Sequence, residues 1–152
     1  MRFAFLLLAT AVLSACNQHS AAELDVRDVV LYAPVTAGTP AVAYFVVRNN
    51  SSLPIRVHRV DSRLFARAEF HATVVSEGLS RMQSVDELHI DAGAEVRLQP
   101  GGMHLMLMRA HTPVTAADRD TLTIYYGENH SMTIETPVSD RLAEPAGLSH
   151  SQ

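Results

Sequence analysis

Short runs of apolar and β-branched residues recur along most of the chain, and several of them alternate with polar residues. Such runs predict β-strands when turn residues separate them. Turn residues do separate them here, as in Pro100-Gly101-Gly102 and Gly127-Glu128-Asn129. Many short strands with regular breaks predict an all-β, single-domain fold, an antiparallel sandwich or barrel. The predicted strands are residues 24–32, 41–48, 55–61, 67–75, 79–84, 94–99, 103–109, 121–126 and 131–138.

One stretch also fits a helix. Between residues 56 and 68, arginines and apolar residues each recur every three or four positions, which is a helical period. The residues are Arg56, Arg59, Arg63 and Arg67, and Val57, Val60, Leu64 and Ala68. A short helix near 57–68 is therefore an alternative to strands over the same residues.

The first residues have the pattern of a signal peptide. Arg2 precedes an apolar run that ends at Leu13, and small residues close the segment. The run is shorter than the roughly 20 apolar residues that a membrane span needs. Its end, Leu13-Ser14-Ala15-Cys16, also matches a bacterial lipobox, in which the cysteine becomes the lipidated first residue. The alternative is an ordinary secretory signal, cut near Ala15 or Ala22.

The lipobox interpretation divides the chain into four parts and places it in the cell envelope. We expect a signal peptide over 1–15, a lipidated tether over 16–22, a β-domain over 23–140 and a flexible tail over 141–152. The protein would then lie in the periplasm, attached to a membrane by a lipid on Cys16.

Composition excludes several classes of function. Lys and Arg number 12 against 16 Asp and Glu, a net charge of −4, and no basic block suits nucleic acid. The only cysteine is Cys16. If Cys16 is acylated, no thiol remains for disulfides, iron–sulfur clusters or thiolate-bound copper. Any soft metal must then be bound by histidine and methionine.

Four residues form the candidate metal site: His71, Met82, His104 and Met106. Ten residues separate His71 from Met82, twenty-one separate Met82 from His104, and one separates His104 from Met106. His104 and Met106 leave the same face of one strand, with Cα atoms about 6.6 Å apart. His71 and Met82 lie in two neighbouring predicted strands, and a sandwich can bring these strand ends together at one rim.

The types of ligand select the metal. Two thioethers and two imidazoles form a soft site that favours one Cu(I) ion over Zn, Mg or Ca. The set lacks the His₂Cys core of electron-transfer copper sites, so we expect it to hold copper and release it rather than cycle electrons. The alternative is that both methionines fill the core and both histidines are surface residues.

The four residues and their spacing resemble the PCu(A)C family of periplasmic copper chaperones. The family signature is His, ten residues, Met, twenty-one residues, His, one residue and Met, and every position matches. The segments Ala43-Tyr44-Phe45 and Leu98-Gln99-Pro100-Gly101-Gly102 are also similar, and the likeness covers roughly residues 23–138. Thr73 and the tail depart from the pattern: many relatives carry a methionine at the former position and a Met/His-rich tail, whereas this tail offers only His150.

The resemblance implies a cupredoxin-like β-sandwich with an exposed Cu(I) site. It also implies that the partner is a copper-accepting protein, either a cytochrome oxidase subunit or an assembly factor. We expect a monomer without a second copper site. A copper-buffering or resistance lipoprotein without a dedicated client is the alternative. An enzyme such as a copper oxidase is disfavoured by the missing thiolate, and a structural lipoprotein would make the four residues incidental.

The other histidines and methionines receive simpler interpretations. Met103, Leu105 and Leu107 point away from His104 by alternation, so we expect them in the core. Met108 shares the ligand face and is expected to pack beneath the site. Four further histidines have no partners at metal-binding spacing and are expected to be surface or locally bonded residues: His58, His89, His111 and His130.

Overall fold

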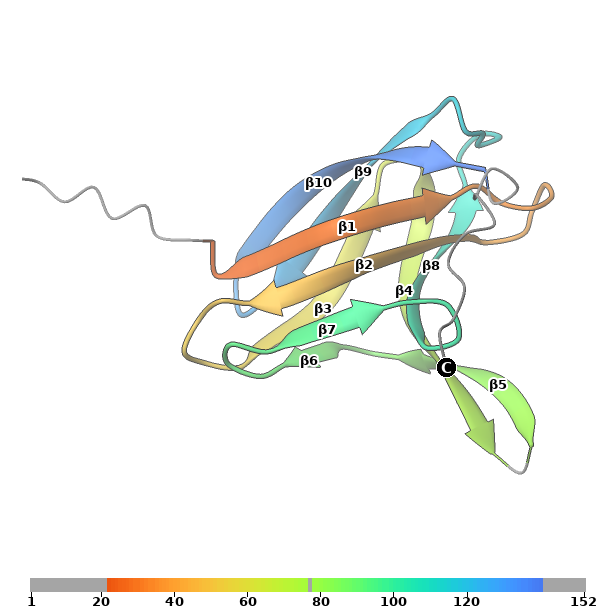
Figure 1. Cartoon of the computed structure of the whole chain (residues 1–152). Helices are drawn as coiled ribbons and strands as arrows, with labels where there is room; N and C mark the ends of the chain where they lie inside the picture. Colours follow the sequence, from red (N-terminus) through yellow and green to blue (C-terminus); the bar gives the residue numbers. More distant parts are fainter. Residues whose placement is uncertain (1–21, 77, 141–152) are drawn as a thin grey trace, which may run out of the picture.

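The computed structural model describes residues 22–76 and 78–140, and over these ranges all regular structure is β-strand (Figure 1). The predicted all-β fold is confirmed. The short strand β6 was not predicted. The strands are β1 (Leu24–Tyr32), β2 (Ala41–Asn49), β3 (Ile55–Ser62), β4 (Phe65–Ser76), β5 (Leu79–Val85), β6 (Leu88–Ile90), β7 (Glu95–Leu98), β8 (Met103–Ala110), β9 (Arg119–Tyr126) and β10 (His130–Ser139).

The predicted signal peptide, Cys16 and the predicted tail lie outside the described residues. Within the described ranges we find no helix with the length and apolar character of a membrane span.

Hydrogen bonds join the strands in the order β5-β4-β8-β7-β2-β1-β10-β9-β3-β6, and β8 also pairs with β2. Most pairs are antiparallel, but β1 with β10 and β7 with β8 are parallel. The sheet folds over on itself, so that residues of β3 and β4 enter one common core. Figure 1 shows β3 and β9 behind β1 and β2, with β10 beside β1. The result is a sandwich-like domain in which one half, β5-β4-β8-β7-β2-β1, carries the candidate site.

The core is built from alternate residues of the facing strands. In β8, Leu105 and Leu107 are fully buried, and Met103 packs against the same core, as alternation predicted. Leu122 and Ile124 of β9 face them from the other half of the sheet. Because every second residue of β8 is committed to the core, the residues between them point outward.

The stretch with the helical period is not a helix. Residues 55–62 form β3, and β4 begins at Phe65. Val57 and Val60 are both buried although they are three residues apart. Their spacing is explained by a bulge, because the register against β9 shifts between Val57 and Arg59. A bulge adds one residue to a strand and thereby imitates a helical spacing, so the helix alternative is wrong.

A buried carboxylate fixes the start of β4. Asp120 of β9 is fully buried and accepts hydrogen bonds from the Ser62 hydroxyl at 2.6 Å and from the backbone N–H of Arg63 at 3.0 Å. It also accepts the N–H groups of Leu64 at 3.1 Å and Thr121 at 2.8 Å. A buried carboxylate requires such partners. Asp120 therefore ties the turn between β3 and β4 to β9.

Replacing Asp120 by alanine should destabilise the fold. The change removes the acceptor that a hydroxyl and three backbone N–H groups share, and it leaves a hole in the core, so we expect the free energy of unfolding to fall by about 3 kcal/mol. Urea denaturation followed by circular dichroism measures it. The matched control is Asp61→Ala, which breaks only an exposed ion pair with Arg59 and should cost about 1 kcal/mol or less. Equal losses in the two variants would contradict the role of Asp120.

Candidate metal centre

The register of β4 places the four predicted ligands on one face of the sheet. Across β4 and β8, His71 lies opposite His104, and Glu69 lies opposite Met106. Across β4 and β5, Thr73 lies opposite Met82. Opposed residues point to the same side of a sheet, and so do alternate residues of a strand. All four therefore project from the outer face of this half of the sheet.

The core side of the same strands confirms this orientation. Phe70 lies opposite Leu105 in the pairing of β4 with β8, and both are buried in the core. Each is the immediate neighbour of a predicted ligand, His71 in β4 and His104 in β8. Since neighbours in a strand point to opposite faces, burying Phe70 and Leu105 turns both histidines outward.

The two histidine rings are stacked, with centroids 6.0 Å apart and an interplanar angle of 29°. His104 is 7% exposed, and its Nδ1 lies 3.1 Å from the carbonyl oxygen of Gly102. A carbonyl oxygen can only accept a hydrogen bond, so Nδ1 must donate its proton. The unprotonated nitrogen of neutral His104 is then Nε2, which is the state that a metal ligand requires.

In His71, too, one ring nitrogen has a hydrogen-bond partner and the other has none, but the two nitrogens exchange roles. Its Nε2 lies 3.3 Å from the Oε2 atom of Glu69. Its Nδ1 is buried and is the one buried side-chain nitrogen or oxygen without a hydrogen-bond partner in the described part of the chain. Buried polar atoms are nearly always satisfied, so such an atom calls for a ligand or another explanation.

The two methionines differ in exposure. Met106 is partly buried, whereas Met82, on the edge strand β5, is 62% exposed. Both line the same hollow as His104, together with Thr73, Gly101 and residues of β2. His71 does not line this hollow and lies against the His104 ring instead. Three of the four predicted ligands thus line one hollow, and the fourth, His71, is stacked on the ring of His104.

The predicted location at a rim of strand ends is right only in part: Gly101 and the first residues of β2 line the hollow, and His104 is the second residue of β8, but His71 is not at a strand end. His71 lies in the middle of β4, and the site occupies the outer face of the sheet. The reason is the length of β4, whose 12 residues pair first with β8 and then with β5. Figure 1 shows β5 and the end of β4 projecting from the body of the domain as a hairpin. Met82 reaches the site from this hairpin.

Sequence reasoning missed Glu69. Arg67, Glu69 and His71 occupy alternate positions of β4 and therefore share its outer face. The Glu69 carboxylate accepts a hydrogen bond from Arg67 Nε at 2.6 Å. This bond, reinforced by the contact with His71, lowers the pKa of Glu69. Three polar residues at a period of two, ending in a predicted ligand, were the signal available in the sequence.

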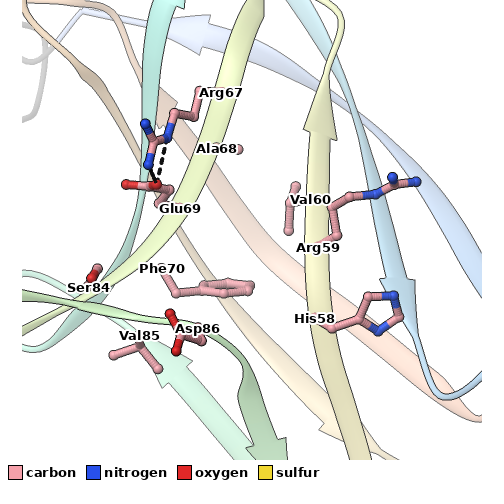
Figure 2. Close-up of a pocket in the computed structure, with 10 residues that line it drawn as sticks. All are labelled: His58, Arg59, Val60, Arg67, Ala68, Glu69, Phe70, Ser84, Val85 and Asp86. Atoms are coloured by element: carbon pink, nitrogen blue, oxygen red, sulfur yellow. Dashed lines mark hydrogen bonds and ion pairs between the residues drawn. The ribbon is translucent and has the colours of Figure 1, made fainter.

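A second hollow is lined by residues of β3, β4 and β5, Glu69 among them. Figure 2 shows Arg67 and Glu69 joined by their ion pair, with Phe70 turned away from them. The lining of this second hollow also includes His58, Arg59 and Asp86, and none of the four predicted ligands belongs to it. It is a polar cleft and not part of the candidate site.

Four further histidines and Met108 do not line the hollow that holds Met82, His104 and Met106. His58, His89, His111 and His130 are all exposed, as predicted. Met108 is partly buried on the ligand face, opposite Arg67 in the pairing of β8 with β4.

The donor atoms limit the metals that the site could hold. In residues 22–76 and 78–140, no group of three His, Cys, Asp or Glu side chains could hold a metal ion. The further donors that line the hollow with His104 are the thioethers of Met82 and Met106. Two imidazole nitrogens and two thioether sulfurs form a soft donor set, which suits a soft, monovalent ion better than Zn, Mg or Ca.

Comparison with known proteins identifies relatives in sequence. The family model described as "Putative lipoprotein LpqE-like" matches residues 24–138. The "Putative lipoprotein Lxx21020" of Leifsonia xyli subsp. xyli is 30% identical over 106 residues, which are 68% of this chain. The match covers 64% of that relative, so the chain spans less than two thirds of its length.

Solved structures with the same fold are also found. The copper-bound PCuAC domain from PmoF2 superposes with a TM-score of 0.64 at 22% identity, covering 78% of this chain and 93% of that domain. The Cu(I) form of DR1885 from Deinococcus radiodurans gives a TM-score of 0.61 at 22% identity, covering 78% of each chain. The resemblance to the PCu(A)C family is thereby confirmed: the chain belongs to the LpqE-like lipoprotein family and has the fold of a PCuAC domain.

Proposed function

We propose that this protein is a periplasmic copper chaperone that binds one Cu(I) ion through His71, Met82, His104 and Met106. The observation that carries the proposal is the strand register, which gathers two imidazoles and two thioethers on one face. Each imidazole also has one nitrogen held by a neighbour and one left for a ligand. The copper-bound PmoF2 domain and the Cu(I) form of DR1885, which share the fold, support the choice of metal.

The chemistry of the ligands suits transfer better than storage. Thioethers are neutral, weak ligands, so an acceptor that offers stronger donors can displace them. The exposed Met82 is the ligand that an acceptor reaches first, whereas His104 is almost completely buried. We infer that copper leaves by exchange of Met82 for a donor of the acceptor, while the histidines hold the ion until the exchange is complete. This role is that of a carrier and not of an enzyme.

The acceptor is proposed from the resemblance to the PCu(A)C family. It is a copper-accepting protein of cytochrome oxidase assembly, either an oxidase subunit or an assembly factor. Attachment to the membrane would keep the carrier close to such a partner. The lipoprotein family and the lipoprotein relative support an anchor, which we assign to Cys16.

Conservative changes of the methionines test the ligand set. Leucine matches methionine in volume but lacks sulfur, so Met82→Leu and Met106→Leu should each weaken Cu(I) binding at least about tenfold, or about 1.4 kcal/mol. Folding should be barely affected, because such swaps cost less than about 1.5 kcal/mol even in a core. Competition with a chromophoric Cu(I) chelator measures the affinity, and thermal denaturation measures the stability.

Met103→Leu is the matched control. Met103 lies in β8 next to His104 but faces the core, so this variant should keep the wild-type affinity. Wild-type affinity in both the Met82 and the Met106 variants would show that these methionines are not ligands, and the proposed function would fail.

The lipid anchor is tested at Cys16. Acylation needs the thiol, so Cys16→Ser should move the protein out of the membrane fraction or leave it unprocessed. Ser14→Ala is the control, because it keeps a small residue in the lipobox and should leave the protein in the membrane fraction. Fractionation and mass spectrometry of the mature N-terminus measure both outcomes. An unmodified N-terminus downstream of Cys16 in the wild type would refute the anchor.

A further inference from the structure

We propose that Glu69 is a positioning residue for the candidate site: it holds His71 in the tautomer that carries its proton on Nε2 and so makes Nδ1 the metal donor. The tautomer of His71 is a property of the protein without metal. The assignment of Nδ1 as the metal donor rests on the proposed function.

The first step is the geometry of the contact. Glu69 and His71 are two residues apart in β4 and share its outer face. The Oε2 atom of Glu69 lies 3.3 Å from His71 Nε2. Oε1 is bound to Arg67 Nε at 2.6 Å, so the carboxylate is fixed from its other side. Arg67, Glu69 and His71 thus form a row along β4 in which the central carboxylate bridges a guanidinium and an imidazole.

The second step is proton placement. An ionised carboxylate can only accept hydrogen bonds, so its partner on His71 must be an N–H group. A neutral imidazole carries one proton, and a proton on Nε2 leaves a lone pair on Nδ1. Carboxylates that receive the second N–H of a metal-binding histidine fix the ring and raise its basicity in this way.

The third step is the buried atom on the opposite side of the ring. His71 Nδ1 is buried without a hydrogen-bond partner in the described residues. Leaving a buried polar atom unsatisfied costs free energy. A metal ion that accepts the Nδ1 lone pair would remove this cost. The contact between Glu69 and Nε2 thus both fixes the tautomer and leaves the Nδ1 lone pair available to a metal.

The two histidines are oriented by different groups. For His104 the backbone carbonyl of Gly102 receives Nδ1–H and leaves Nε2 free. For His71 the side chain of Glu69 receives Nε2–H and leaves Nδ1 free. The geometry therefore assigns Nδ1 of His71 and Nε2 of His104 to the site. Only the assignment of His71 Nδ1 depends on a side chain, that of Glu69, which mutation can remove.

Long-range ¹H–¹⁵N correlation spectra of the intact protein without metal, recorded at a pH where histidine is neutral, test the tautomers. The proposal expects His71 with its proton on Nε2 and His104 with its proton on Nδ1. In Glu69→Ala, His71 should lose its single tautomer, whereas in Glu69→Gln the amide oxygen still accepts Nε2–H and should largely preserve it. A wild-type His71 that carries its proton on Nδ1 would overturn the proposal, even if every variant failed to fold.

Cu(I) affinities of the same proteins provide the second measurement. Removing an outer partner of a metal-bound histidine typically costs 10–100-fold in affinity, so Glu69→Ala should weaken binding at least about tenfold and Glu69→Gln less. Glu95→Ala is the control, because Glu95 also pairs with an arginine two residues away, Arg97, and with Arg27 of β1, but does so in β7 and contacts none of the four candidate ligands. It should leave the affinity unchanged.

The outcomes separate this inference from the proposed function. Wild-type protein that binds no Cu(I) refutes the proposed function and the donor assignment, while the tautomer spectra still decide the role of Glu69. Wild-type protein that binds Cu(I), with both tautomer and affinity unchanged in Glu69→Ala, refutes the inference alone. Equal weakening in Glu69→Ala and Glu95→Ala would also refute it, because the effect would then be general.

Discussion

The register between β4 and its two neighbours decides where every side chain of the candidate site points. A slip of one residue in a strand pairing exchanges its two faces. Such a slip would place the histidines in the core and Phe70 in solvent. Two features oppose it: the buried pair of Phe70 and Leu105, and the Asp120 carboxylate that holds the turn before β4. The site is thus a consequence of how the core is packed on the opposite face.

The exposure of the four candidate ligands varies across this face, which suits a carrier that must both hold an ion and release it. His104 is buried and its ring is held by a backbone carbonyl, whereas Met82 projects from an edge strand into solvent. Rigid imidazoles favour holding an ion, and an exposed thioether favours its exchange. Had all four donors been buried, the proposed release would require part of the sheet to open, because interiors are closely packed.

Runs of apolar and β-branched residues, several of them alternating, were enough to predict nine of the strands, even though β5 is exposed along almost its whole length. The prediction failed where the period was disturbed: the bulge between Val57 and Arg59 imitated a helix, and β6 is only three residues long. The spacing of the four candidate ligands indicated which residues belong together but not their place on an outer face. That place depends on strand pairing between distant segments, which a single sequence does not reveal. The contact of Glu69 with His71 is local to β4 and needs only the alternation of its residues.

The most direct test of the central claim is X-ray absorption at the copper edge of the protein loaded with one equivalent of Cu(I). The account predicts a first shell that contains both nitrogen and sulfur, with two imidazole nitrogens and two thioether sulfurs, at an edge energy typical of Cu(I). A first shell without sulfur, or one without imidazole, would contradict the assignment of His71, Met82, His104 and Met106 as the copper ligands.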